Sequence, residues 1–417
     1  MRSGNANWIA YALPQSNGTA ATISKRVTMR DPSRYARTDR SPATSRQRRT
    51  IVLGLAVALV IVPSLASAQV APPPTTPPPT TPPPTTPPPA AAPVPSSTDF
   101  NAGQSAGIAI GDLGSQFLRR LGDQASYGFN RASRANPGGG GASETTETPR
   151  FRSWAEFYGV GARTSTIGDF VGDKRRTIGG VAGIGARLMP GVNVGLSVDQ
   201  SHTTIDVPLA LQSATLDLTQ IGVNASVDQG AWTWAIALVH GFGDINSRRD
   251  TGLGLASAGY NARIDGALTE LSYYWSYEQA RIVPKAAFEY TRATTGAMQE
   301  LGGLNPVNAS GASAERARIL MGVEVGRYWI FDQKILDLSG YAKFVDNVHQ
   351  RFSNVTISLG AESITVQGIG ESQYGADAGA SASLSLSNTA RLYLNYDGKF
   401  RAYSQSHQGT LGVEFKF

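Results

Sequence analysis

The sequence predicts an all-β fold, a 12-stranded antiparallel transmembrane β-barrel with a preceding amphipathic helix in or near its lumen. Residues 151–417 alternate apolar with small or polar residues, which is the period of a strand with two different faces. Five tight turns also alternate with longer polar connections: Met189-Pro190-Gly191, Asp228-Gln229-Gly230, Glu278-Gln279, Asp332-Gln333 and Ser387-Asn388. Twelve strands with both ends on one side need five connections there, and outer-membrane barrels keep their short turns on the periplasmic side.

Charge and composition exclude several other classes of protein. Residues 1–50 hold ten of the 37 Lys and Arg but only two of the 31 Asp and Glu, so the remaining 27 basic and 29 acidic residues nearly balance. The basic charge therefore lies in a leader and not on a nucleic-acid-binding face. Since the chain has no cysteine, disulfides and thiolate metal sites are impossible.

Residues 1–68 are predicted to be a leader and signal peptide, cleaved near 68/69 and recognised by the export translocon. Arg46, Arg48 and Arg49 precede the apolar run 51–62, and Ala66-Ser67-Ala68 supplies the small residues of a cleavage site. A transmembrane anchor is the alternative, but twelve apolar residues are fewer than the roughly 20 that a membrane-spanning helix needs.

Residues 69–102 are predicted to be a proline-rich stalk. Within them, residues 72–89 repeat Pro-Pro-Pro-Thr-Thr, which favours an extended polyproline II spacer. A ligand for a proline-reading domain is the alternative interpretation.

Residues 103–122 are predicted to form the amphipathic helix, because apolar residues recur at helical spacing. At roughly 1.5 Å per residue, some eighteen helical residues would span about 27 Å, close to the ~25 Å apolar band of a barrel, so the helix could thread and plug the lumen. Packing at the barrel mouth is the alternative. The candidate plug residues are Ile110, Leu113, Phe117, Arg119, Arg120 and Leu121. Residues 123–150, which include Gly138 to Gly141, are predicted to be a flexible linker.

The two faces of the strands favour lipid outside and a polar lumen inside. Charges of both signs lie on the face opposite the apolar residues: Glu270, Lys285, Glu289, Glu324, Lys343, Arg391, Asp397, Lys399, Glu414 and Lys416. Aromatic residues such as Trp232, Trp234, Tyr273 and Trp329 gather near the tight turns, as expected of an interfacial girdle. The alternation slips by one residue around Thr219 and Gln220, which predicts a β-bulge there. A soluble all-β fold is the alternative.

Catalysis is not expected. The four histidines have no metal-ligand spacing and are predicted to occupy lumen or loop positions. Ser201, His202, His240 and Asp244 carry the residue types of a hydrolase site, but such residues are common in barrel lumens. No phosphate-binding or dinucleotide-binding motif is present, so we predict no enzyme activity, no cofactor and no metal.

The chain resembles the translocator barrel of autotransporters, the type V secretion family, over about residues 103–417. The resemblance rests on the helix before the barrel, the opening strand Arg152-Ser153-Trp154-Ala155-Glu156-Phe157-Tyr158-Gly159, the twelve strands and the terminal strand 411–417. It implies a Gram-negative outer-membrane protein whose helix passes through the pore to an exported passenger. It also implies a signal for the barrel-assembly machinery at Leu411, Val413, Phe415 and Phe417.

Two departures from the family pattern leave the function open. Only residues 69 to about 102 separate the predicted signal peptide from the helix, and the join from residue 123 to 150 is long. The first hypothesis is a barrel that displays a short N-terminal segment. The second is a structural or adhesive barrel with a periplasmic stalk, and the third is a narrow pore. We expect a monomer in contact with outer-membrane lipid.

Overall fold

The computed structural model describes residues 93–127, 149–331, 334–387 and 389–417. Its helical elements are η1 (Ser97–Phe100), α1 (Asn101–Tyr127) and η2 (Pro208–Ala210). The strands are β1 (Phe151–Thr164), β2 (Asp173–Met189), β3 (Val192–Val207), β4 (Gln212–Gln229), β5 (Trp232–Asp250), β6 (Leu255–Tyr273), β7 (Trp275–Tyr277), β8 (Ala280–Thr295), β9 (Met298–Gln299), β10 (Asn308–Ala309), β11 (Ala312–Phe331), β12 (Lys334–Phe352), β13 (Asn354–Leu359), β14 (Glu362–Gln367), β15 (Tyr374–Ser385), β16 (Ala390–Arg401) and β17 (Ser404–Lys416).

The strands form a closed antiparallel barrel in the order β1, β2, β3, β4, β5, β6, β8, β11, β12, β15, β16 and β17. Closure comes from the pairing of β1 with β17, which runs from Arg152 opposite Lys416 to Thr164 opposite Ser404. Strand β7 continues β6 beyond Tyr274 and pairs with the same neighbour, β8. Twelve strands therefore make the wall, and the predicted fold class is confirmed.

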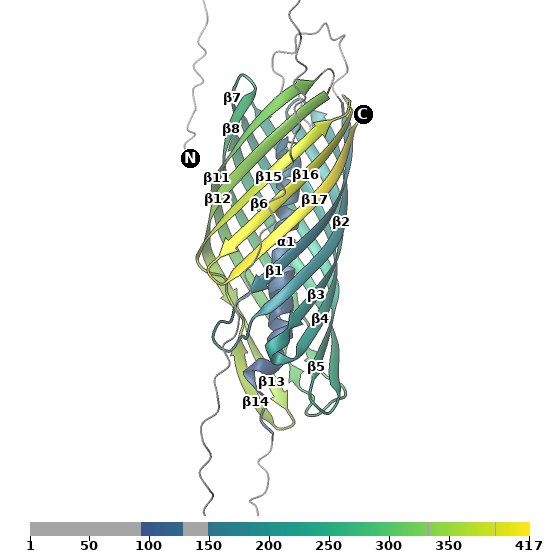
Figure 1. The fold of residues 1–417 in the computed structure, drawn as a ribbon, viewed down its shortest axis with the longest axis vertical. Helices are drawn as coiled ribbons and strands as arrows, with labels where there is room; N and C mark the ends of the chain where they lie inside the picture. The colour runs from purple at the N-terminus through teal and green to yellow at the C-terminus, as the bar shows by residue number, and fades with distance from the viewer. Residues whose placement is uncertain (1–92, 128–148, 332–333, 388) are drawn as a thin grey trace, which may run out of the picture. The chain divides into compact units, whose positions relative to one another are not determined.

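The connections follow the predicted alternation, with one difference. The tight turns lie at the end of the barrel that also holds the C-terminus (Figure 1). Asp332-Gln333 and Asn388, from two of the predicted turns, fall outside the described residues. At the opposite end, β16 and β17 are joined only by Ala402 and Tyr403. Several loops expected to be long are short because the strands themselves continue past the apolar band as hairpins.

The two long connections at the loop end form a small sheet of their own. Strands β9 and β10 lie between β8 and β11, β13 and β14 lie between β12 and β15, and the four pair in the order β14-β13-β10-β9. This sheet lies at the end of the barrel away from the C-terminus (Figure 1). It covers the place where η1 leads into α1.

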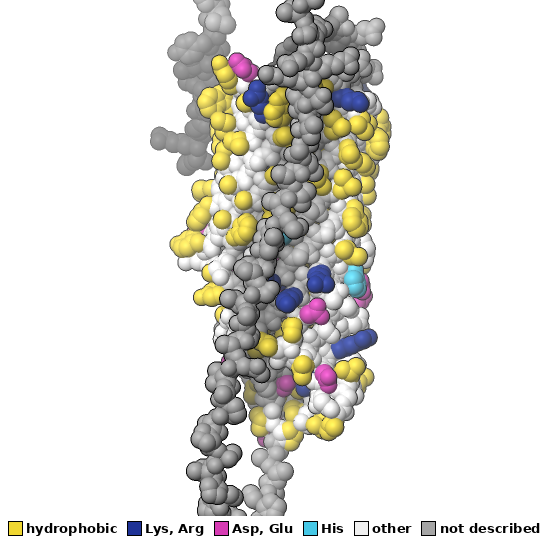
Figure 2. All heavy atoms as spheres, viewed as in Figure 1, with side chains coloured by type: hydrophobic (Ala, Val, Ile, Leu, Met, Phe, Trp, Pro, Cys, Tyr) yellow, Lys and Arg dark blue, Asp and Glu magenta, His cyan; other side chains and the backbone are white. Residues whose placement is uncertain are grey.

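Over most of the turn-side part of the barrel, apolar side chains point outward and polar or small side chains point inward, as predicted. On β5, the outward side chains of Trp234 and Leu238 are each 50% exposed, whereas the inward Thr233 is fully buried. Figure 2 shows apolar side chains over much of the turn-side half of the visible face, with charged side chains at its turn edge and again in the loop-side half. Near the turns Trp232 packs edge-on against Tyr273, with ring centroids 4.8 Å apart, as an interfacial girdle would.

The predicted bulge at Thr219 and Gln220 is wrong. β4 keeps an unbroken register with both β3 and β5 through these residues. Instead, Leu216 and Leu218 turn apolar side chains into the lumen, because there they pack against the buried start of α1. The lumen becomes apolar at its loop end, so the apolar residues change face while the strand stays regular.

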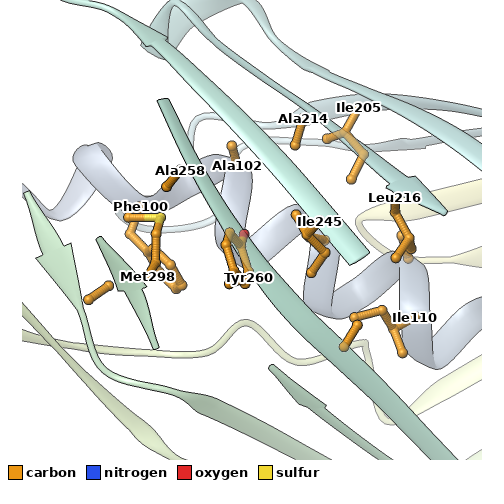
Figure 3. Packing of buried hydrophobic residues seen from close by; sticks show 14 of the residues in the cluster. Phe100, Ala102, Ile110, Ile205, Ala214, Leu216, Ile245, Ala258, Tyr260 and Met298 are labelled. Atoms are coloured by element: carbon orange, nitrogen blue, oxygen red, sulfur yellow. The ribbon is translucent and has the colours of Figure 1, made fainter. Parts of the chain in front are cut away.

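α1 supplies much of the barrel interior. At its loop-side half it packs into a cluster of buried side chains from β3, β4, β5 and β6, among them Ile205, Leu216, Ile245 and Tyr260 (Figure 3). Farther along, Phe117, Leu118 and Leu121 pack against Val239 and Leu268. Among the described residues, no helix has both the length and the apolar character required to cross a membrane.

The helix is longer than predicted at both ends. It covers Asn101–Tyr127 instead of 103–122, so the predicted linker 123–150 begins with helical residues and the predicted stalk 69–102 ends with them. η1 precedes it, and Ser96 caps η1 by accepting from the backbone of residue 98 while Asp99 accepts from the backbone of Ser96. The signal peptide, the Pro-Pro-Pro-Thr-Thr repeat and Gly138 to Gly141 lie outside the described residues.

Candidate functional site in the barrel lumen

α1 runs through the lumen with its N-terminal end at the loop side of the barrel. There, the Ala102 backbone N–H donates to Gln212 Oε1 at the first residue of β4, over 2.8 Å. At the other end, Ser226 near the turn end of the same strand donates to the Ala125 carbonyl over 2.9 Å. Because both contacts involve β4, the helix must follow that strand from the loop end to the turn end (Figure 1).

The apolar plug residues predicted from the sequence all lie inside the barrel. Ile110, Phe117 and Leu121 have no exposed surface and Leu113 retains 4%. Strand β4 makes room for them with Gly222, where an added Cβ would overlap Leu121 Cδ1. A glycine on the wall therefore lets the helix approach the sheet closely.

Arg119, the first of the two predicted arginines, joins α1 to two separate strands. Its Nε lies 3.2 Å from Glu289 Oε2 on β8, and its Nη1 is paired with Asp377 on β15. Both carboxylates are 1% exposed, and each has a second guanidinium partner on the wall. For Asp377 the second partner is Arg401, at 2.8 Å. Charges buried in this way need partners of opposite sign, because an uncompensated buried charge is costly. Here the arginine of α1 and the arginines of the wall share the same two carboxylates.

Arg120 faces another part of the wall. Its Nε lies 2.6 Å from Glu156 Oε2 on β1, and its guanidinium stacks 4.3 Å from the ring centroid of Tyr158. The Tyr158 hydroxyl in turn donates to Asp199 on β3 over 2.9 Å. The arginine is thus held by an ion pair and a cation–π contact in a buried setting.

Further pairs extend the contacts of Arg119 into a connected lumen ion network. Asp112 on α1 accepts from Arg175 on β2 at 3.1 Å and lies 3.6 Å from Arg316 on β11. Glu371, before β15, pairs with Arg316 at 2.6 Å. The network comprises Asp112, Arg119, Arg175, Glu289, Arg316, Arg318, Glu371, Asp377 and Arg401.

Most members of the lumen ion network were not identified as site residues from the sequence. Strand parity alone assigns Glu289 to the lumen, and the same rule applied to β11 and β15 would have found Arg318 and Asp377. Which of them meet depends on barrel register, which periodicity does not contain. The network fixes how far α1 is inserted and how it is rotated, because its partners come from β2, β8, β11, β15 and β16.

α1 lies closer to one side of the barrel than to the other. It packs along β3 to β6 and leaves a cavity of about 140 Å³ toward β12, β15 and β16. The cavity is lined largely by polar and charged side chains, including Gln116, Arg120, Lys343, Tyr341, Asn395 and Asp397. A polar space beside the helix suits water and small ions.

At the loop end, Arg249 of β5 holds the start of the helical segment in place. Its Nη2 lies 2.6 Å from Glu300 and donates to the Asn305 carbonyl over 2.8 Å, while Nη1 lies 3.5 Å from Asp99 in η1. This part of β5 lies beyond the apolar band. Hydrogen bonding to Glu300 raises the pKa of the Arg249 guanidinium, so the clamp stays charged.

The predicted assembly-signal residues lie on the outer face of the closing strand. Leu411 and Phe415 are each 51% exposed, and Val413 is 37% exposed. The Phe417 ring stacks against Phe151 with centroids 6.2 Å apart, and the two residues exchange backbone hydrogen bonds of 2.8 and 3.0 Å. The terminal aromatic therefore closes the barrel seam.

The hydrolase-like residues do not come together. Ser201 is buried on the lumen side of β3, whereas His202 points outward and pairs with Asp217 at 2.6 Å. His240 also points outward and pairs with Asp265 at 2.7 Å. His407 also lies on the outer face, with Nδ1 2.8 Å from the Tyr396 hydroxyl, and His349 is exposed on the outer face of β12. The prediction that the histidines occupy lumen or loop positions is therefore wrong, since strand parity turns them to the outer face. Within the described part of the chain, no cluster of three or more potential metal ligands occurs.

Comparisons with known proteins agree with this architecture. A family model described as "Autotransporter beta-domain" matches residues 153–397. The translocator domain of autotransporter NalP from Neisseria meningitidis is similar with a TM-score of 0.60 and 14% identity, over 77% of this chain and all of that one. The β domain of the Bordetella autotransporter BrkA gives 0.50 and 15%, over 64% of this chain and all of that one.

A sequence relative is the "Extracellular serine protease" of Serratia marcescens, 22% identical over 276 residues, which cover 64% of this chain. The chain spans about a quarter (26%) of that relative's length, and the description as a protease belongs to the relative. The family model covers more than half of the chain and agrees with the barrel. The chain therefore belongs to the autotransporter β-domain family and is a Gram-negative outer-membrane protein.

Proposed function

We propose that the barrel anchors the chain in the outer membrane and holds a short N-terminal segment at the cell surface, with α1 as the thread through the lumen. Residues preceding Pro93 would then leave the barrel at its loop end. In this proposal residues 1–68 direct export through the translocon, and Leu411, Val413, Phe415 and Phe417 are read by the barrel-assembly machinery.

The observation that carries the proposal is the direction of α1. Asp99 and Ala102 contact Arg249 and Gln212 at the loop end. At the turn end, Gln124 accepts from Arg152 Nη1 over 2.7 Å, next to the start of β1. Since outer-membrane barrels place short turns in the periplasm, the N-terminal end of the helix faces outward.

The lumen ion network supports a stable thread over a loose one. Arg119 and Asp112 both form ion pairs with wall residues, at two separate positions in the middle of α1. If α1 left the lumen, Glu156 would lose its ion pair with Arg120, and Glu289 and Asp377 would each keep only one guanidinium partner, which disfavours an empty lumen. We therefore assign α1 a second role as the plug of the resting barrel.

Surface labelling tests the display of the N-terminal segment. Because the chain has no cysteine, a single Val94→Cys substitution gives one reactive thiol at a residue that is 63% exposed. A membrane-impermeant maleimide applied to intact cells should label it. Leu386→Cys, 51% exposed at the turn end, is the matched control and should react only after the outer membrane is permeabilised.

Protection of both cysteines in intact cells, with the barrel correctly inserted, would overturn the display proposal. The result would favour the structural or adhesive barrel with a periplasmic stalk. Labelling of both positions without permeabilisation would mean a leaky membrane, so the intactness of the cells is checked with a periplasmic marker enzyme.

A narrow pore is a second candidate function, favoured by the polar cavity of about 140 Å³ beside α1. Planar-bilayer recordings of the whole protein should show small or intermittent conductance. Deletion of residues 103–122 should enlarge it severalfold if the helix is the plug. Unchanged conductance after this deletion would exclude plugging by the helix.

A further inference from the structure

A group of exposed arginines lies on the outer face of the barrel, outside the lumen site. The outer arginine patch consists of Arg263 on β6, Arg292 on β8 and Arg351 on β12, together with the carboxylates Asp265 and Glu315. With three guanidiniums and two carboxylates, the patch carries a net positive charge. It takes no part in holding α1.

The β-sheet register brings these residues side by side. Arg292 lies directly opposite Asp265 on β6 and opposite Glu315 on β11. Glu315 in turn lies opposite Arg351 on β12. Two arginines therefore flank one carboxylate across three neighbouring strands, at the roughly 5 Å spacing of adjacent strands.

The patch lies at one edge of the lipid-facing band. On β8, ten residues separate Ile282 from Arg292, which is about 33 Å along the strand and about 25 Å of height at a tilt of roughly 40°. The exposed outward residues between them are Pro284, Ala286 and Phe288. This height equals the apolar thickness that a barrel presents to the membrane, so Arg292 lies at the level of the outer-leaflet headgroups.

The guanidiniums of the outer arginine patch have N–H donors that are not used within the protein. The Arg292 Nε lies 3.4 Å from Glu315 Oε1, and the Arg292 side chain is still 54% exposed. Within the residues that the structure describes, Arg263 and Arg351 have no hydrogen-bond or ion-pair partner. A guanidinium has five N–H donors and can bind a phosphate group through two parallel hydrogen bonds. The contact of Arg292 with Glu315 uses only part of its donors, so Arg292 can bind phosphate as well.

We propose that the outer arginine patch is a binding site for the phosphate groups of a phosphorylated glycolipid in the outer leaflet. The acyl chains would lie along the apolar side chains of β8 and β11, including Phe288 and Met321, which are 45% and 56% exposed. The phosphates would lie between Arg292 and Arg351, with Arg263 as an additional donor. Such a site would fix the depth of the barrel in the membrane on this side.

The opposite leaflet offers a matched control residue. Arg327 is an exposed, outward arginine on β11, twelve residues from Glu315 and therefore about 30 Å closer to the turn end. Its guanidinium stacks on Trp329 at 5.6 Å. Loss of this charge should affect inner-leaflet contacts alone.

The test uses the whole mature protein in phosphatidylcholine nanodiscs, doped with lipid A, with dephosphorylated lipid A or with phosphatidylglycerol. Native mass spectrometry measures the retained lipid. The wild type should retain lipid A in preference to both other lipids. The double variant Arg292→Gln/Arg351→Gln should lose at least tenfold of that retention, and Arg327→Gln should retain lipid A as the wild type does.

Equal retention of lipid A by the double variant and the wild type would overturn the proposal. Equal retention of phosphatidylglycerol and lipid A by the wild type would overturn the glycolipid assignment, since any phosphate lipid would then serve. The shift of the folded barrel in unheated gel electrophoresis confirms that each variant is folded before its lipid is measured. This readout is independent of surface display, so failure here leaves the proposed function untouched.

Discussion

Arg119 of α1 and Glu289 of β8 form a buried ion pair, with Nε 3.2 Å from Oε2, that joins the lumen helix to the barrel wall. Glu289 is 1% exposed and has a second partner in Arg318. Neither charge has ready access to water, so each depends on its ion-pair partners. This dependence makes the position of α1 sensitive to single substitutions.

Arg119→Met should loosen α1. Loss of one member of a buried pair costs about 3 to 5 kcal/mol when the other charge is left alone. The cost should be smaller here, because Glu289 and Asp377 lose a shared partner but keep Arg318 and Arg401. We expect a lower unfolding temperature of the purified barrel and more frequent channel openings in planar bilayers. Arg248→Met, at an exposed outward residue of β5, is the control and should change neither.

Gly222→Val should push α1 away from β4. An added side chain would overlap Leu121 and press on Phe117, and overpacking of this kind costs about 1 to 3 kcal/mol. Ala225→Val, on the outward face of the same strand, is the matched control. Protease accessibility of the helix in the folded barrel measures the effect, and equal resistance of both variants would contradict close packing at Gly222.

Leu238→Arg should impair membrane insertion. The Leu238 side chain is 50% exposed on the apolar face of β5, and an arginine near the bilayer midplane costs about 2 to 4 kcal/mol. Asn246→Arg lies on the same face of the same strand but nearer the loops, where the cost falls to about 0 to 1 kcal/mol. The folding free energy in lipid vesicles should separate the two, and similar values would mean that the band is placed wrongly.

Phe417→Ala should slow closure of the barrel. The variant loses the ring contact with Phe151, although the backbone hydrogen bonds between the two residues can still form. We expect a reduced fraction of folded barrel in the outer membrane of cells, measured by gel mobility without heating. Phe400→Ala, at a residue that is 40% exposed on β16, controls for the loss of an outer-face aromatic.

Arg249→Ala should release the start of the helical segment. Glu300 and Asp99 would lose their shared cation at the loop end, outside the apolar band. Limited proteolysis should then cut within residues 93–100 more rapidly, while the unfolding temperature of the barrel changes little. An unchanged cleavage rate would show that other contacts, such as the bond from Gln212 Nε2 to the Thr98 carbonyl, are sufficient.

The helix α1 shows which features can be predicted from the sequence and which cannot. Helical spacing predicts an apolar face at Ile110, Leu113, Phe117 and Leu121, and the structure buries all four. The last turns of the helix, up to Tyr127, contain Gln124 and Ser126 and contact the wall through polar groups. The apolar spacing that predicts the helix therefore does not extend to its end. Threading and packing at the mouth could not be distinguished, since both satisfy the same amphipathic pattern.

The bulge predicted at Thr219 from the change of phase in the apolar residues is an error of a different kind. A change of phase in the apolar residues has two physical causes, an inserted residue or a change in what the lumen contains. Leu216 and Leu218 belong to the second case, since α1 makes the loop-side lumen apolar. The sequence of a single strand does not show which element packs against it inside the lumen.

The sequence by itself determined the barrel, because inside and outside alternate with a period of two that each strand carries locally. The tight turns and the terminal aromatic residue are likewise local features, which can be recognised from a few neighbouring residues. Only the tertiary structure decided the direction of α1 and the partners of Arg119 and Arg292. These follow from strand register and barrel closure, which bring Glu289 and Asp377 to one helix residue although they lie far apart in the chain.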